Sequence, residues 1–67
     1  MIIEVEQELD GRWIADVPEL PGVIVYGKTR VGAVRNVKVL ALRVLSDIIE
    51  HGESGAVVDI LFTETSK

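Results

Sequence analysis

One long segment with helical periodicity dominates this sequence and limits the folds available to it. Between Thr29 and Gly52, apolar residues recur at i, i+3, i+4 and i+7, the spacing that lines one face of a helix. That face comprises Ala33, Val37, Leu40, Ala41, Val44, Leu45 and Ile48. Thr29 is placed to cap the N-terminus, and His51-Gly52 is typical of a helix C-terminus. The other segments are strand-like, so we expect this helix to cover one face of a sheet.

The first two strand-like segments, residues 2–8 and 12–17, predict a hairpin with a defined register. A three-residue loop pairs Glu8 with Arg12 and places Gly11 where such loops need a left-handed residue. A two-residue loop would shift the register by one position and put the tryptophan on the same face as the glutamates. We therefore expect the three-residue loop. Its inner face would carry Ile3, Val5, Gln7, Trp13, Ala15 and Val17, and its outer face Glu4, Glu6, Glu8, Arg12, Ile14 and Asp16.

A proline-containing connector and two further strands complete the predicted fold. Residues 18–22, P-E-L-P-G, do not suit a sheet interior, and Pro21-Gly22 favours a type II turn. Residues 23–27 and 57–63 predict a third and a fourth strand. We expect one domain over residues 1–67 of the α+β class, a two-layer β-β-β-α-β fold. Its mainly antiparallel sheet would be covered on one face by the long helix.

Composition narrows the classes of function. The chain has 67 residues and no cysteine, so neither disulfides nor thiolate metal sites stabilise it. The formal net charge of −4 argues against nucleic acid as a direct ligand and is compatible with a basic protein partner. No apolar run approaches the roughly 20 residues of a membrane span, and the N-terminus lacks the basic start of a signal peptide. We expect a cytoplasmic protein.

Some apolar residues of the helix lie outside its main apolar face or at its edge, namely Val39, Leu42 and Ile49. Such residues are either scattered over the surface or in contact with another chain. A domain this small buries only about 60% of its unfolded surface, so association is a common source of stability. We expect a homo-oligomer, either a dimer or a tetramer, with these three residues at its interface.

Acidic residues gather on the predicted outer face of the sheet. Glu4, Glu6 and Glu8, with Asp16 nearby, form a stripe that has three interpretations. It is a solvated face that discourages edge-to-edge aggregation, a docking surface for a basic protein, or a divalent metal site built on Glu4 and Asp16. Tyr26 is either a contact at the rim of the docking surface or a packed edge residue.

The sequence shows no arrangement of catalytic residues. The single histidine, His51, is expected to cap the helix, and no serine lies near a plausible base in sequence. The glycines lack the spacing of a phosphate-binding loop. Arg35, Lys38 and Arg43 carry too little charge to indicate a nucleic-acid site. We predict a protein without catalytic residues, cofactor or metal.

Residues 10–30, D-G-R-W-I-A-D-V-P-E-L-P-G-V-I-V-Y-G-K-T-R, resemble the N-terminal domain of HicB-type antitoxins, a small bacterial and archaeal family. The shared marks are the turn glycine, the aromatic residue two positions later, the P-E-L-P-G connector, the glycine ending the third strand and the threonine cap. The later E-H-G-E segment also resembles the family. The resemblance implies a β-β-β-α-β domain that oligomerises and neutralises a small basic HicA-type toxin. Such toxins cleave RNA and have a double-stranded-RNA-binding-like fold.

The sequence departs from the family pattern in two places. Family members usually carry a C-terminal helix-turn-helix or ribbon-helix-helix module that binds their operator. This sequence stops at Lys67, so direct DNA binding is not expected of this chain. Val31-Gly32 also stands where the family has acidic residues that complete a capping box, so we expect Gly32→Glu to raise the melting temperature.

Two other functions remain open beside the antitoxin. One is an orphan oligomeric domain that acts in protein interaction or binds a small ligand. The other is a vestigial metal-dependent nuclease-like domain that uses Glu4 and Asp16.

Overall fold

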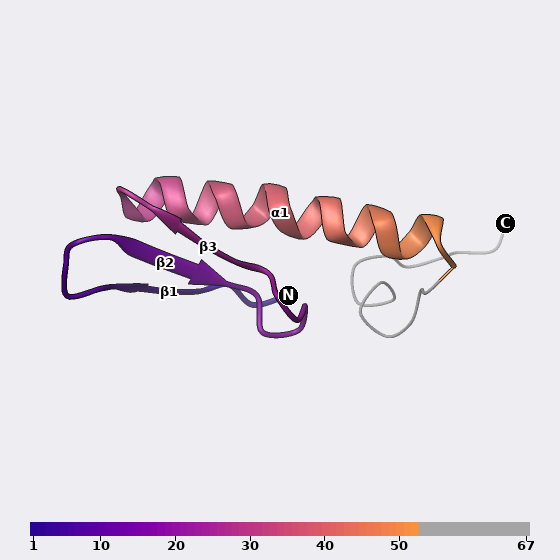
Figure 1. The fold of residues 1–67 in the computed structure, drawn as a ribbon, viewed down its shortest axis with the longest axis horizontal. Coiled ribbons are helices and arrows are strands. Elements are labelled where there is room, and N and C mark those ends of the chain that lie inside the picture. Colours follow the sequence, from indigo (N-terminus) through magenta and orange to yellow (C-terminus); the bar gives the residue numbers. More distant parts are fainter. Residues whose placement is uncertain (53–67) are drawn as a thin grey trace, which may run out of the picture.

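Three short strands followed by one long helix make up the part of the chain that the computed structural model describes, residues 1–52. Strands β1 (Glu4–Gln7), β2 (Trp13–Asp16) and β3 (Ile24–Gly27) form an antiparallel sheet in the order β1-β2-β3. Helix α1 (Arg30–Glu50) packs lengthwise against one face of this sheet (Figure 1). The fold is therefore α+β with the order β-β-β-α. The fourth strand predicted for residues 57–63 lies outside the described residues.

The register of the β1–β2 hairpin is the one predicted from a three-residue loop. Glu4 lies opposite Asp16, and Gln7 lies opposite Trp13. The loop closes with two backbone hydrogen bonds, from Glu8 N–H to the Arg12 carbonyl (2.7 Å) and from Gly11 N–H to the Glu8 carbonyl (3.0 Å). Gly11 has φ +94°, the left-handed conformation that the loop requires. This register confirms the predicted separation of an apolar inner face from an acidic outer face.

The core lies between the inner face of the sheet and α1. Its buried residues are Ala15, Val17, Leu20, Val23, Ala33, Val37, Ala41 and Leu45. The helical half of this list belongs to the apolar face that the periodicity predicted. Leu20 was not expected, because it belongs to the connector between β2 and β3. The turn at Pro21-Gly22, where Gly22 has φ +83° and Val23 N–H donates to the Leu20 carbonyl (3.1 Å), allows its side chain to enter the core.

Both ends of α1 are capped as the sequence predicted. At the start, Gly32 N–H donates to Thr29 Oγ1 over 2.9 Å. At the end, His51 Nδ1 donates a hydrogen bond to the carbonyl oxygen of Asp47 over 2.7 Å. Gly52 follows with φ +72°, which directs its N–H to the carbonyl of Ile49. The backbone groups left unpaired by helix geometry are thus partly satisfied at each end.

The end of β3 and the first turn of α1 approach each other closely. A Cβ atom at Gly27 would lie only 2.6 Å from the backbone nitrogen of Ala33 and 2.9 Å from its Cα. The side chain of Ala33 is fully buried at this contact. Gly27 therefore allows the helix to begin directly against the sheet. Among residues 1–52, no helix has the length and apolar run needed to cross a membrane.

Candidate protein-binding surfaces

The outer face of the sheet, opposite α1, carries carboxylates around an aliphatic floor. β1 contributes Glu4 and Glu6, β2 contributes Ile14 and Asp16, and β3 contributes Ile24. Their cross-strand pairing sets Glu4 opposite Asp16, Glu6 opposite Ile14, and Asp16 opposite Ile24. Together with Val5, these residues line a shallow hollow of about 260 Å³, here called the outer-face hollow. It offers negative charge and apolar surface in the same place.

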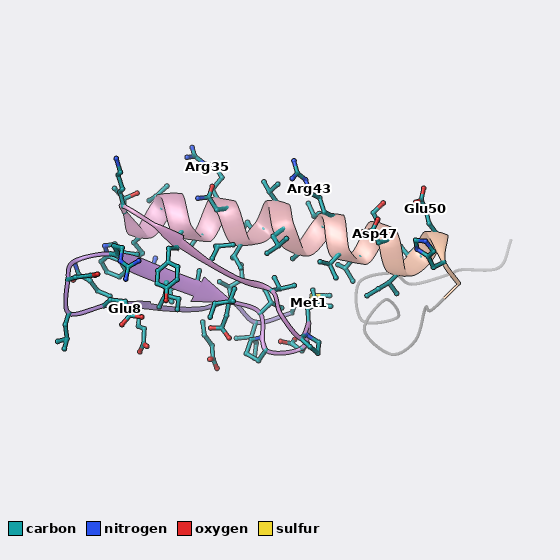
Figure 2. All side chains as sticks on the ribbon, viewed as in Figure 1. Met1, Glu8, Arg35, Arg43, Asp47 and Glu50 are labelled. Carbon is teal, nitrogen blue, oxygen red and sulfur yellow. The ribbon has the colours of Figure 1, made fainter. Side chains whose placement is uncertain are left out.

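The outer-face hollow contains three of the five residues predicted to bind a partner. Glu4, Glu6 and Asp16 line it, whereas Glu8 and Tyr26 do not. Glu8 lies beyond the end of β1, next to the hairpin turn, and its side chain points away from α1 (Figure 2). The acidic stripe is therefore continuous along β1, but only its distal part, away from the turn, surrounds the hollow.

Tyr26 lies beside Arg12, a residue that the sequence placed on the outer face without assigning it a role. The guanidinium carbon of Arg12 lies 4.6 Å from the centre of the Tyr26 ring, a cation–π contact. Tyr26 stays about half exposed there. Tyr26 of β3 pairs with Ile14 of β2, so Arg12, two residues earlier, is its diagonal neighbour across the two strands. It could have been inferred only with the β2–β3 register, which the sequence alone did not provide.

The same arginine is held by the hairpin loop. Arg12 Nε donates to Asp10 Oδ2 over 2.7 Å, and Arg12 N–H donates to Asp10 Oδ1 over 3.0 Å. These two hydrogen bonds lower the pKa of Asp10 below its ordinary value, and the one from the backbone N–H of Arg12 has the larger effect. Arg12 thus places a positive charge, partly neutralised by Asp10, at the turn end of the outer face.

The described residues offer a poor site for a divalent cation. Glu4 and Asp16 face each other across the hairpin, as the sequence predicted. Within residues 1–52, however, no group of three or more histidine, aspartate or glutamate side chains is placed to hold a metal ion. Hard cations take six or more oxygen ligands in most protein sites. The nuclease interpretation therefore gains no support from this pair.

A second candidate surface runs along α1. A groove of about 360 Å³ has an apolar floor and a basic rim. The floor is formed by Val31, Val34, Val39 and Leu42, and the rim by Arg30, Arg35 and Lys38. Val39, Leu42 and Ile49, the residues predicted for an oligomer interface, are all exposed. The first two line this helix groove and Ile49 lies beyond it, whereas Val31, which is 75% exposed, was not predicted.

The described residues thus present two surfaces of different chemistry. The outer-face hollow combines carboxylates with aliphatic side chains, and the helix groove combines aliphatic side chains with basic ones. No protein-family model, no curated protein and no solved structure matches this chain. A function for either surface is therefore inferred from its chemistry and from the resemblance of residues 10–30.

Proposed function

We propose that this protein is a HicB-like antitoxin module of a type II toxin–antitoxin system. It acts in the cytoplasm without catalytic activity and binds a small basic ribonuclease toxin so that the active site of the toxin is occluded. Two observations support this proposal. Residues 10–30 resemble the antitoxin family in sequence, and the outer face of the sheet has the charge and shape to bind a basic surface.

The composition of the outer-face hollow is the observation that carries the proposal. Lysine and arginine side chains have a long apolar stem and a charged end. Ile14 and Ile24 would contact the stem, while Glu4, Glu6 or Asp16 pairs with the charge. An acidic face also speeds encounter with a basic protein and excludes acidic ones. The aliphatic floor gives this face an apolar contact for such stems in addition to its negative charge.

Binding at this face leaves the fold undisturbed. The outer-face hollow and α1 lie on opposite sides of the sheet, so a partner on the outer face does not displace the helix. Inhibition then requires only steric cover of the toxin together with charge pairing. We expect both partners to keep their free structures, as in most preorganised complexes.

Affinity purification from the cells that make this protein tests whether the partner exists. We expect a single small basic protein that stays bound at low salt and is released at high salt, as charge-driven binding requires. Recovery of this protein alone, or of partners that salt does not release, would contradict the proposal.

Charge reversal then tests the surface. Changing Glu4, Glu6 and Glu8 together to lysine should weaken binding of the recovered partner at least tenfold and reduce its salt dependence. The matched control compares Glu6→Lys with Asp47→Lys, an equal charge change on α1. Both should keep the wild-type circular dichroism spectrum, and only Glu6→Lys should lower affinity. Equal affinities for the two single variants would remove the outer face from the mechanism.

A further inference from the structure

Every residue that lines the helix groove belongs to α1, and these residues fall into two neighbouring rows with i, i+4 spacing. One row is Arg30, Val34, Lys38 and Leu42, and the other is Val31, Arg35 and Val39. Each row therefore carries a basic side chain between two apolar ones. The depression between two such rows receives an i, i+4 row of a second helix that crosses the first at roughly 50°. The shape of the groove thus suits a helix.

The basic side chains of the groove form no ion pair within residues 1–52. The only ion pair there joins Arg12 to Asp10 at the hairpin loop, and the first turn of α1 holds no acidic residue. Arg35 and Lys38, one from each row, are exposed and three residues apart, so their like charges are neighbours on the helix surface and repel each other. Carboxylates from another molecule would relieve this repulsion.

We propose that the helix groove binds an acidic amphipathic helix of another protein. An apolar row of that helix lies between the two rows of α1, and carboxylates on either side of it pair with Arg35 and Lys38. Burial of Val31, which is 75% exposed, and Leu42, which is 65% exposed, supplies affinity. The charge pairs select an acidic partner over a basic one.

The chemistry of the groove disfavours three other occupants. A second copy bound groove to groove would bring identical basic side chains together, because a twofold contact joins the same surface of both chains. A small ligand would be covered on one side only, by one helix, whereas small-molecule sites bury most of the ligand. A flat anionic membrane along α1 would also meet Asp47 and Glu50, which lie with Arg35 on the side away from the sheet (Figure 2).

This site does not depend on the proposed antitoxin function. The helix groove lies on α1, whereas the outer-face hollow is on the opposite face of the sheet, so both surfaces can be occupied at once. Its test needs only the purified chain and synthetic peptides. Failure of that test would leave the test of the antitoxin function unaffected.

Selection from a display library of helical peptides shows what the groove prefers. The full 67-residue chain is the bait, and Val31→Glu serves for counter-selection. This variant should fold normally, because the side chain is exposed and an acidic residue in the first turn favours the helix dipole. We expect the enriched peptides to be acidic, with apolar residues at i and i+4 and carboxylates beside them. Enrichment of basic or uncharged peptides, or of none, would overturn the proposal.

Fluorescence anisotropy with one enriched peptide, at about 0.15 M salt, then tests the charge pairing. Arg35→Glu should weaken binding by roughly tenfold. The matched control is Arg43→Glu, the same change one turn beyond the groove and on the same exposed side of α1, which should leave the affinity almost unchanged. Both variants should keep the wild-type circular dichroism spectrum. Equal affinities for the two variants would overturn the proposed pairing.

Two measurements without peptide test the other occupants. In sedimentation equilibrium, we expect the wild type and Val31→Glu to have the same association state. Self-association that Val31→Glu abolishes would mean that the groove binds another copy, and would overturn the proposal. We also expect no cosedimentation with vesicles of phosphatidylcholine and phosphatidylserine. Binding to these vesicles that Val31→Glu abolishes would assign the groove to a membrane surface instead.

Discussion

The close contact between Gly27 and the first turn of α1 makes a sharp prediction about stability. In Gly27→Ala, the new Cβ would lie 2.6 Å from the backbone nitrogen of Ala33, whereas an ordinary contact begins at 3.4 Å. Backbone atoms cannot rotate away as side chains do. The helix would have to retreat by roughly 0.8 Å, which weakens the dispersion contacts of the buried Ala33 and Val37 with the sheet. Overpacking of this kind costs about 2–3 kcal/mol.

Thermal denaturation followed by circular dichroism at 222 nm measures this cost. For a domain of this size we expect the melting temperature to fall by on the order of 10–20 °C. Gly32→Ala is the matched control, because its Cβ would meet only the hydroxyl of Thr29, at 3.0 Å. A small shift of that hydroxyl accommodates it, so the melting temperature should not fall. Protein concentration must be equal in all samples, since association raises apparent stability. If Gly27→Ala melted within 2–3 °C of the wild type, about the effect of 0.5 kcal/mol, α1 would not begin against β3 as described.

Two further predictions concern the helix cap and the hairpin loop. Thr29→Ala should destabilise the protein by about 1 kcal/mol, measured by urea denaturation. Thr29→Ser should destabilise it by much less, because serine keeps the hydroxyl that accepts the hydrogen bond from Gly32 N–H. Equal losses of stability in the two variants would argue against this cap. Gly32→Glu should raise the melting temperature by a few degrees, since a glutamate gains helix propensity and favours the N-terminal dipole, and a fall would mean that displacing the Thr29 hydroxyl costs more. Asp10→Asn should lower the melting temperature at pH 7. The pKa of Asp10 is lowered in the folded state, so its carboxylate contributes fully to the free energy of unfolding above the pKa of a free aspartate, about 3.9. This contribution is lost as the pH falls through the lowered pKa. The difference in melting temperature between the wild type and Asp10→Asn should therefore narrow in acid. A difference independent of pH would contradict this reasoning.

The local features of the fold were predictable because each rests on a short-range rule. The hairpin register follows from the alternation of β1 and from the need for a left-handed residue at Gly11. The limits of α1 follow from Thr29 at one end and His51-Gly52 at the other, both confirmed. In these segments, the turn chemistry, the period of the apolar residues and the caps all favour the same structure.

Features that depend on the relation between distant segments were not predictable. Nothing in the sequence pattern placed Leu20 in the core, since the residue lies between two prolines in a connector. Neither the strand order nor the β2–β3 register could be inferred, and both are needed to bring Ile24 beside Asp16 or Tyr26 beside Arg12. The acidic residues of the outer face were therefore predicted, but the aliphatic floor between them was not.

The alternation along β1 also affects how the surface of this protein can change during evolution. Val5 packs against the core, whereas Glu4 and Glu6 on either side of it line the outer-face hollow. Substitutions at the glutamates change the charge and shape of the outer face with little effect on the free energy of unfolding, while substitutions at the valine change the packing of the core and therefore the free energy of unfolding. Residues one position apart are thus under separate constraints. The outer face can therefore change in charge and shape while the helix-covered side of the sheet stays the same.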